Sequence, residues 1–488
     1  TAEENDIFWK VGSRFPQTQL RADPFLTSVA PRPAAWICTD QDEIALLEGY
    51  TIACDSPPSL IFGSKAIPSS MLETLKEKKL CSLSIATVRE RHCLPYASFR
   101  AKDDVTSGPA LTFQKLGLFP VTRSNRPPAV DRSPVQMHCK LVELVNLVDD
   151  QEMVILEIET VVISGSVLAG PTIETADGRA LPTRVSADLI QPMVSLGNGK
   201  FASMNHIHKM VRPKAEKRAD GSISSWNSDP FQKVISSDQI ESGNRSLWTH
   251  PQDVEYTYRV EGPKSILGYN PLKAIVIPRA IGWVSTYSEN ARVPHLAPYS
   301  FFTEIGRGDC PMVCFSAYRS SWEDDGKKDA QLDSEGTGCF AVNMVTKDLA
   351  VKMNYTSAPL KRGESEFELS SLNEKSGHLV DAPTVEESQV VLECKHVKTV
   401  NIGNFSAVVG RVVGGRLNTS VVTNGQLDPD RLKLIGRMGY VDEYAVVEKK
   451  KARTFADFNC SAKIVDEKVA LEKVRSRVIL RAHRRFSL

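Results

Sequence analysis

The chain repeats itself, and this repeat constrains the fold more than any other feature of the sequence. Three pairs of segments match in the same order: PRPAAWICT (31–39) with PRAIGWVST (278–286), CSLSIAT (81–87) with CFAVNMV (339–345), and PAVDRSPVQMHCK (128–140) with PTVEESQVVLECK (383–395). A fourth match sets YTIACDSPPSLIFGS, from Tyr50, beside YSFFTEIGRGDCPMVCFSA, from Tyr299. A constant order at a spacing of about 250 residues predicts two copies of one structural unit.

The repeat divides the 488 residues into four segments. We expect a first domain at 1–204, a linker at 205–262, a second domain at 263–448 and a basic tail at 449–488. The linker is rich in charged and small polar residues, but its aromatic side chains predict that it docks on a domain: Trp226, Phe231, Trp248 and Tyr256. The tail either packs on the body or extends as a solvated basic face, with a weak role on RNA or an anionic surface as the alternative.

The composition excludes several classes of protein. Sixty basic and 59 acidic residues nearly cancel, so nucleic acid is not expected as a partner. No apolar run approaches the roughly 18 residues of a membrane helix, and residues 1–10 lack the apolar core of a signal peptide, which predicts a cytoplasmic protein. The ten cysteines show no paired spacing and are expected to be reduced core thiols.

Each copy is predicted to consist mainly of strands. In the first copy, segments rich in Val, Ile and Leu are bounded by Pro, Gly, Asp or Ser, which is typical of strands; they are 34–39, 59–63, 80–87, 135–148 and 152–167. One helix is expected among them, at 69–79. Many short strands with few helices favour a barrel or a sandwich.

The second copy resembles the flavin reductase-like, FMN-binding split-barrel family. The motifs that carry the resemblance follow one another in the family's order: PRAIGWVST, HLAPYSFF, CFS, KKDA and MNYTS, between 278 and 357. The resemblance continues through AVVGRVVGG and LDPDRLKLIGRMGYVDEY to about residue 447. It implies a mainly β protein with some α structure, in which two FMN-binding split β-barrel domains are fused as an intramolecular pseudo-dimer.

The same resemblance implies a set of FMN-binding residues. Backbone amides and hydroxyls of two segments would border the ring and ribityl chain: Trp283, Ser285 and Thr286, and Ala297, Pro298, Tyr299 and Ser300. Ser316 and Lys328 would meet the phosphate while Asp329 positions the turn, Lys327 could substitute for its neighbour, and Asn354 and Ser357 would assist. The alternative for each is an ordinary strand, core or solvated-turn residue.

His295 departs from the family pattern, in which Asn precedes Leu-Ala-Pro-Tyr-Ser. Its ordinary pKa near neutrality makes it the candidate acid or base at the flavin, and an inert surface histidine is the alternative. The first copy is more eroded. It keeps Tyr50 within LEGYT, but its counterpart of the lysine turn, IPSSMLETL, has no basic residue, so one working site and one relic are expected.

The resemblance implies an FMN-dependent oxidoreductase, of the NAD(P)H:flavin reductase type, with NADPH or NADH as co-substrate. Gly403-Asn404-Phe405 stands where shorter reductases of the family carry Gly-Asp-His, which leaves room for a flavin enzyme that acts directly on a small organic substrate. A noncatalytic flavin-binding or partner-binding protein is the third alternative. No metal site is expected, because the one tight histidine cluster, His206 and His208, offers too few ligands by itself. The substrate, the preferred nicotinamide and further pairing of two chains stay open.

Overall fold

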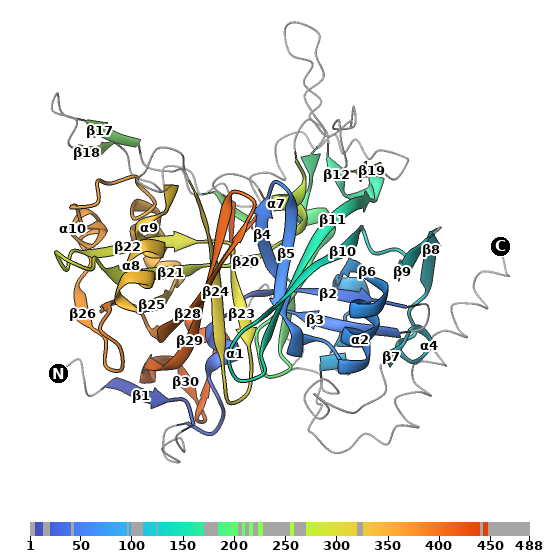
Figure 1. The fold of residues 1–488 in the computed structure, drawn as a ribbon, viewed down its shortest axis with the longest axis horizontal. Helices are drawn as coiled ribbons and strands as arrows, with labels where there is room; N and C mark the ends of the chain where they lie inside the picture. Colours follow the sequence, from blue (N-terminus) through green and yellow to red (C-terminus); the bar gives the residue numbers. More distant parts are fainter. Residues whose placement is uncertain are drawn as a thin grey trace, which may run out of the picture.

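The computed structural model describes residues 5–12, 20–40, 43–94, 97–98, 111–123, 125–169, 184–203, 270–319, 326–439 and 443–447, and the backbone of four short strands at 207–209, 214–217, 223–227 and 254–257. These residues form two mainly β domains side by side, the first on the right of Figure 1 and the second on the left. The two-domain β architecture that the repeat predicts is confirmed.

The first domain is built on an antiparallel sheet with the strand order β15-β14-β2-β6-β10-β11-β5-β4, and β3 pairs with β2. Its main strands are β2 (Arg32–Cys38), β3 (Glu43–Glu48), β4 (Thr51–Asp55), β5 (Pro58–Gly63), β6 (Leu80–Ile85), β10 (Val135–Asn146), β11 (Glu152–Ile163), β14 (Met193–Ser195) and β15 (Phe201–Ser203). Shorter elements are α1 (Phe25–Ser28), β7 (Leu111–Thr112), α4 (Phe113–Leu116), β8 (Pro120–Arg123), β9 (Arg126–Val130), β12 (Leu168–Ala169), β13 (Arg184–Val185) and α5 (Ala187–Ile190). The five predicted strands are present, and the predicted helix is α2 (Ser69–Lys78).

The second domain repeats this plan with the strand order β22-β21-β25-β28-β29-β24-β23. Its main elements are α7 (Leu272–Ile275), β20 (Arg279–Ala280), β21 (Gly282–Tyr287), β22 (Pro294–Tyr299), β23 (Phe302–Gly306), β24 (Met312–Tyr318), α8 (Asp329–Thr337), β25 (Cys339–Met344), α9 (Ala350–Tyr355), α10 (Glu366–Ser370), β28 (Val390–Ile402) and β29 (Phe405–Asn418). Shorter elements are β26 (Glu374–Ser376), β27 (Pro383–Val385), β30 (Val422–Thr423), β31 (Gln426–Leu427), α11 (Pro429–Leu432), β32 (Ile435–Arg437) and β33 (Glu443–Val446). β22 lies at the edge of the sheet.

The strand register aligns the two copies residue by residue. Tyr299 lies opposite Gly282 and Leu47 lies opposite Ala35, and Gly282 and Ala35 hold the same position in the repeated PRxxxW segment. Leu47 is therefore the counterpart of Tyr299. The sequence match that gave this place to Tyr50 was wrong by three residues, because the loop before the strand is longer in the second copy.

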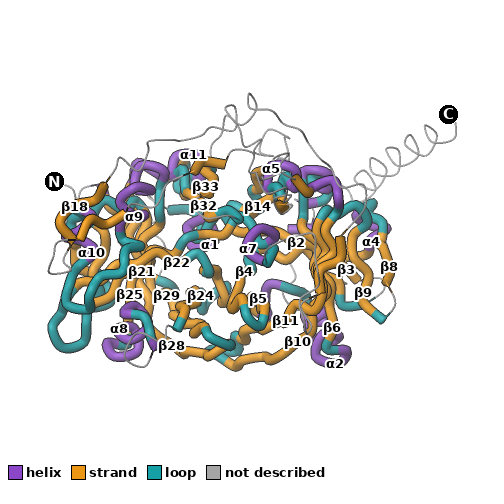
Figure 2. The backbone as a smooth tube through the Cα atoms, turned by 90° about the horizontal axis from the view of Figure 1, so that it is seen from above, coloured by secondary structure: helices purple, strands orange, loops and turns teal. Residues whose placement is uncertain are grey.

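The domains meet where β23 packs against β4 and β5, in the middle of Figure 1, and the tube in Figure 2 shows the two sheets on either side of this seam. Contact there is backbone on backbone: a Cβ atom at Gly63 would lie 1.7 Å from the carbonyl oxygen of Ile305. Gly403 turns between β28 and β29 with a φ of +56°, and a Cβ there would lie 2.6 Å from the carbonyl oxygen of Ser56. Glycine is required at both points.

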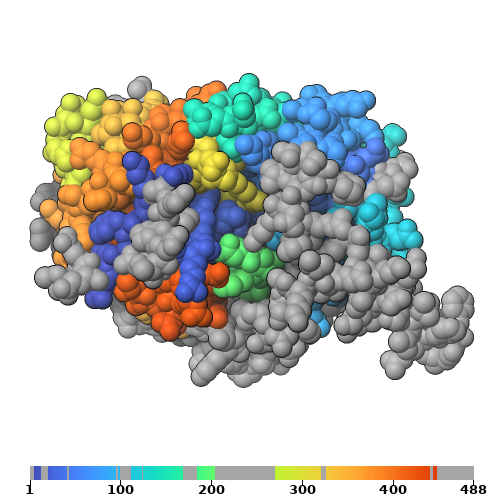
Figure 3. Space-filling view, turned by 90° about the horizontal axis from the view of Figure 1, so that it is seen from below, coloured from blue at the N-terminus to red at the C-terminus, as the bar shows by residue number. Residues whose placement is uncertain are grey.

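A strand exchange adds to this interface. β1 (Asp6–Lys10), which precedes the first copy in sequence, pairs antiparallel with β29 of the second domain. In Figure 3 the N-terminal segment, in blue, lies across the orange and red surface of the second domain. Trp9 is buried in this position. A segment that precedes the first copy in sequence thus contributes a strand to the second sheet.

An ionic cluster is buried between the domains. The Arg32 guanidinium, 1% exposed, contacts Glu304 and donates to Ser195 Oγ at 2.8 Å. Arg307 donates to Glu304 at 2.8 Å. Burial opposes ionisation of Glu48, but Arg32, Arg307 and the Ser195 hydroxyl outweigh it and lower the pKa of that carboxyl. Glu48 is therefore held as a carboxylate against the two arginines.

The equivalent place on the other side of the pseudo-two-fold axis has no counterpart of the acid Glu304. Arg279, the counterpart of Arg32, is buried but donates to the carbonyl oxygens of Val276 at 2.7 Å and Met438 at 2.9 Å. By the register above, Ile52 stands where the second domain has Glu304. Burial lowers the pKa of Arg279 to about 9. The interface is thus asymmetric in charge, although its backbone plan is symmetric.

The ends of the predicted linker contact both domains. β16 (Ile207–Lys209) pairs with β33, and β19 (Val254–Thr257) pairs with β11, with Tyr256 opposite Val161. Trp226 lies in the hairpin of β17 (Lys214–Lys217) and β18 (Ile223–Asn227). The described residues do not include Phe231, Trp248, the side chains of His206 and His208, or the tail at 449–488. The segment boundaries stay predictions.

The nine cysteines of the described residues are all buried free thiols, which confirms the expected core role for these nine. Burial raises the pKa of Cys54, Cys310 and Cys339 and so disfavours the thiolate. Among the helices of the described part of the chain, none has the length and hydropathy of a membrane span.

Replacing Glu304 by Gln is expected to lower the free energy of unfolding by about 3 kcal/mol, because the buried charge of Arg32 loses its nearer carboxylate and keeps only Glu48, at 3.8 Å. Urea unfolding followed by tryptophan fluorescence measures the change. Asp149→Asn is the matched control, because it removes an exposed inter-domain ion pair with Arg411 (2.8 Å) that is worth at most about 1 kcal/mol. Equal losses in the two variants would contradict the assigned role of the buried pair.

Candidate functional site

Four of the predicted flavin-binding residues form a half-exposed corner at the edge of the second sheet. Ala297, Pro298 and Tyr299 end β22, and Ser300 begins the turn into β23, and all four are partly accessible while β21 behind them is buried. The Tyr299 ring rests on Phe315, with 4.7 Å between ring centroids. We call these residues, 297–300, the β22 corner. It offers an edge strand and an aromatic surface to a ligand.

Ser316 lies beside this corner with an unsatisfied hydroxyl. Its backbone N–H donates to the carbonyl oxygen of Phe301 at 2.8 Å, which places it next to the turn that follows Ser300. The residue is only 4% exposed, and its Oγ has no hydrogen-bond partner among the described residues. A buried hydroxyl without a partner costs free energy unless a ligand or a water meets it. Ser316 is therefore suited to contact a bound polar group.

The predicted phosphate-binding turn lies at the start of α8, which packs on β21, β22 and β25. Lys328, half-buried, immediately precedes the helix, and Asp329 is its first residue. Lys327 is committed to an ion pair with Glu335 at 2.8 Å. A positive side chain before a helix N-terminus, where backbone N–H groups lack intrahelical partners, suits an anionic group.

Side chains of β21 point into the protein. Trp283 Nε1 donates to Thr356 Oγ1 at 2.8 Å, Ser285 donates to the carbonyl oxygen of Pro383, and Thr286 donates to Asp333 Oδ2 at 2.9 Å. These hydrogen bonds engage the polar groups of all three side chains. Any contact of β21 with a flavin would come from its backbone, and that role stays a prediction.

The other two predicted helpers lie on α9 and just after it. Asn354 is 5% exposed near the end of the helix, and Ser357 follows it and donates to the Asn354 carbonyl oxygen at 2.7 Å. α9 packs against β22, so both residues lie on the side of the sheet that carries the corner. Their contact with a flavin stays a prediction.

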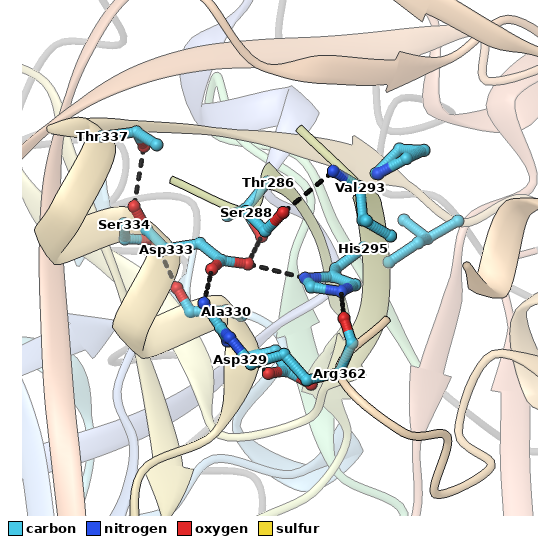
Figure 4. A network of polar contacts seen from close by, with 12 residues as sticks. Thr286, Ser288, Val293, His295, Asp329, Ala330, Asp333, Ser334, Thr337 and Arg362 are labelled. Atoms are coloured by element: carbon cyan, nitrogen blue, oxygen red, sulfur yellow. Dashed lines mark hydrogen bonds and ion pairs between the residues drawn. The ribbon is translucent and has the colours of Figure 1, made fainter. Parts of the chain in front are cut away.

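His295 is held between α8 and the loop before α10, as Figure 4 shows. Nδ1 lies 2.7 Å from Asp333 Oδ2, and Nε2 lies 2.7 Å from the carbonyl oxygen of Arg362. Both neighbours are acceptors, so both ring nitrogens carry a proton and the ring is an imidazolium. Burial disfavours this charge, but the hydrogen bond and charge of Asp333 outweigh it and raise the pKa of His295. The ring is buried rather than on the surface.

Sequence reasoning missed the partners of this histidine. Arg362 donates to Asp333 Oδ1 at 2.5 Å and also pairs with Asp329. Asp333 is fully buried, and Gln331, 1% exposed, has an Oε1 without a partner among the described residues. The sequence did contain a signal for a buried polar network. The short helix DAQLDSEGT places polar residues on its buried face, where an ordinary surface helix has apolar ones. The acid or base role of His295 stays a prediction.

The first domain lacks the corresponding groups. Counting from the equivalent threonines Thr303 and Thr51, the counterpart of Ser316 is Gly63. Its Cα approaches the carbonyl oxygen of Ile305, so the position is occupied by backbone of the other domain. The helix that corresponds to α8 is α2, which begins at Ser69 and is preceded by Ile67 and Pro68. No hydroxyl and no lysine take the places of those in the second domain.

Among the described residues no group of three metal-ligating side chains is present.

Comparison with known proteins identifies the family. The chain matches the family described as "Flavin reductase like domain" at residues 27–175 and 275–431. These two matches span more than half of the chain, which therefore belongs to the flavin reductase-like family and carries its split-barrel domain twice. The tandem duplication and the fold class predicted from the sequence are confirmed.

The most informative relatives match one copy each. An uncharacterized protein of Deinococcus radiodurans is 34% identical over 177 residues, which cover 35% of this chain and 77% of the relative. One of Aquifex aeolicus is 30% identical over 172 residues, covering 35% and 86%. The crystal structure of nitrilotriacetate monooxygenase component B from Bacillus cereus is 26% identical, covers 36% of this chain and 87% of its own, and has a TM-score of 0.34.

The His295 imidazolium makes the stability of the second domain depend on pH. Because the folded pKa is raised, its contribution is complete below the unfolded value of about 6.5 and is lost as the pH rises through the folded pKa. His295→Asn is expected to lower the free energy of unfolding by roughly 2 kcal/mol at pH 6 and by less at pH 9. Urea titrations of both proteins across this range test this. Glu366 contributes to the difference, because burial raises its pKa to about 7 and the charge of His295 lowers it. A pH-independent difference would contradict the charged ring.

Proposed function

We propose that the protein is an FMN-dependent oxidoreductase of the flavin-reductase type, that its second domain holds the FMN, and that NADPH or NADH is the reductant. The observation that carries the proposal is the buried, unpartnered hydroxyl of Ser316 beside the half-exposed β22 corner. It stands in a domain whose family is defined by flavin reductase-like members. The described residues fit the group, because they offer an aromatic surface, an unsatisfied hydroxyl and a lysine.

Each residue then has a defined task. Tyr299, backed by Phe315, supports the flat ring, and the backbone of the β22 corner supplies hydrogen bonds at the sheet edge. The Ser316 hydroxyl donates to an oxygen of the ligand, and Lys328 offsets phosphate charge at the start of α8. When bound, FMN itself supplies the hydride and electron transfer. The protein places the cofactor and excludes water from its buried side.

A second candidate is a flavin enzyme that acts directly on a small organic compound. It is favoured by an aromatic cluster where the shorter reductases carry histidine: Phe405 lies 5.5 Å from Phe301 and 5.3 Å from Tyr318 between ring centroids. Tyr318 is 47% exposed, so the cluster reaches the surface. Such a surface suits an apolar substrate better than it suits a charged nicotinamide nucleotide.

Lys328→Ala is expected to raise the dissociation constant for FMN at least about tenfold, because it removes a charge-assisted contact to the phosphate. Fluorescence quenching of FMN by the apoprotein measures the constant. Lys327→Ala is the matched control and is expected to change it less than about threefold, since that lysine is paired with Glu335. Wild-type protein that binds no FMN at any attainable concentration would end the oxidoreductase proposal.

Anaerobic addition of NADPH or NADH to the FMN-loaded protein separates the two candidates. Bleaching of the visible flavin absorbance within seconds is expected for a flavin reductase, because the nicotinamide transfers hydride directly to the flavin. Stopped-flow absorbance follows the reaction, and FMN free in solution at the same concentration is the control. If neither nucleotide bleaches the bound flavin faster than free flavin, the reductase is contradicted and the direct-substrate enzyme is favoured.

A further inference from the structure

Arg279 is a buried cation that forms no ion pair with any residue the structure describes. Its guanidinium is 2% exposed and donates to the backbone carbonyl oxygens of Lys273, Val276 and Met438 at 2.7, 2.7 and 2.9 Å. Its Nε is buried and has no hydrogen-bond partner in the described part of the chain. Burial, and then the charge of Arg437, lower the pKa of Arg279 to about 9. A buried charge without a counter-charge is unfavourable, and a bound anion would relieve it.

The first domain shows which groups surround the equivalent arginine there. Arg32 holds the position of Arg279 in the repeated segment, and two carboxylates balance its charge: Glu304, which it contacts directly, and Glu48, 3.8 Å from its Nη2. Ser195 lies opposite Arg32 in the β2–β14 pairing and accepts from the same guanidinium at 2.8 Å. The Ser195 hydroxyl also donates to Glu48, so the hydroxyl and this carboxylate are in contact. The arginine of the first copy is thus enclosed by acids that belong to the chain itself.

Each of these three groups is replaced around Arg279. By the strand register, Ser300 stands where the first domain has Glu48, since Tyr299 is the counterpart of Leu47. Ile52 is the counterpart of Glu304. Arg437 lies opposite Arg279 in the β20–β32 pairing and so stands where the first domain has Ser195. Both acids are replaced by uncharged residues, and a hydroxyl is replaced by a second guanidinium.

The two replacing polar groups are available to a ligand. Arg437 is half-buried, with its guanidinium carbon 4.5 Å from the ring centroid of Tyr444, and none of the described carboxylates pairs with it. Ser300 is partly exposed, and its hydroxyl makes no hydrogen bond to a described residue. The neighbouring Lys273 is already paired with Asp55 at 3.1 Å. The place of Glu48 is therefore accessible to solvent at Ser300 and flanked by two arginines.

We infer that Arg279, Arg437 and Ser300 bind the carboxylate of a small organic acid, in the place that Glu48 occupies against Arg32 in the first copy. Guanidinium groups form charge-assisted hydrogen bonds with carboxylates, and the Ser300 hydroxyl donates another. The guanidinium carbon of Arg279 lies 5.9 Å from the ring centroid of Phe301, which in turn contacts Phe405. The site thus adjoins the aromatic cluster, and the acid that fits both carries an apolar body.

This inference rests on the second candidate of the proposed function, the flavin enzyme that acts directly on a small organic compound, and it makes that compound an apolar carboxylic acid. Carboxylate binding is measured on the full chain without flavin. A failure of the carboxylate site is therefore distinct from a failure to bind FMN.

The first test supplies the missing carboxylate from the chain. Ser300→Glu is expected to raise the melting temperature by about 2–4 °C relative to Ser300→Gln, because only glutamate gives the two arginines the charge that Glu48 gives Arg32. The two side chains have the same length, so any packing strain at position 300 affects both variants. Differential scanning calorimetry near pH 7 measures the difference. Equal melting temperatures would show that the arginines need no carboxylate and would overturn the inference.

The second test measures binding directly, with hexanoate as the probe. Isothermal titration is expected to show binding that Arg437→Gln and Ser300→Glu each weaken at least about tenfold, and hexanamide, which has no charge, is expected to bind at least about tenfold more weakly than hexanoate. Arg292→Gln is the matched control, because that arginine also lies on a tyrosine ring, at 4.4 Å, but pairs with Asp381. It is expected to leave binding unchanged. Circular dichroism confirms that each variant is folded.

Comparison of FMN with riboflavin separates the substrate from the cofactor, because riboflavin lacks the phosphate. Arg437→Gln is expected to change the affinities for the two flavins equally. If this variant weakens the binding of FMN but not of riboflavin, the arginines hold the cofactor's phosphate and the inference is wrong. It is also wrong if hexanoate and hexanamide bind equally well, or if hexanoate does not bind at any attainable concentration.

Discussion

Backbone-to-backbone packing between the two copies is the constraint on which the rest of this structure depends. Gly63 against Ile305 and Gly403 against Ser56 bring the domains closer than any side chain would allow. Such contact restricts the relative position of the two sheets, because packed interiors have few voids and do not deform continuously. It also fixes which residues can differ between the copies. Gly63 and Gly403 cannot carry a side chain, whereas other interface positions differ between the copies, as Glu304 and its counterpart Ile52 do.

Divergence followed this division. The buried acid Glu304 has Ile52 as its counterpart, so only Arg32 of the two equivalent arginines keeps a carboxylate. Ser316, with its unsatisfied hydroxyl, has Gly63 as its counterpart. Gly63 packs against the backbone of Ile305 in the interface and has no room for a side chain. In a symmetric dimer one residue must serve both sides. Fusion into one chain removes that requirement, since the seam and the ligand site are then encoded by separate codons for each copy.

The sequence predicted the parts of this structure that depend on local pattern and order. Strand identity followed from segments rich in Val, Ile and Leu, and the two domains followed from matched segments. The helix expected at 69–79 is present at Ser69–Lys78. It failed where a loop changed length, as at Tyr50, because identity of one residue cannot reveal register. It also could not supply the partners of His295, since Asp333 and Arg362 lie 38 and 67 residues away and meet it only in the folded domain.

Those partners bear directly on the phosphate-binding turn. Asp329 stands beside Lys328, and an unpaired carboxylate there would repel a phosphate dianion at short range. Arg362 pairs with Asp329 and with the fully buried Asp333, and the imidazolium of His295 adds a second positive charge to the same acids. Two acids and two cations therefore balance within the network, and α8 keeps two carboxylates near its N-terminus without presenting net negative charge. On this argument, the histidine that departs from the family pattern contributes to charge balance around α8, beside the proposed flavin site.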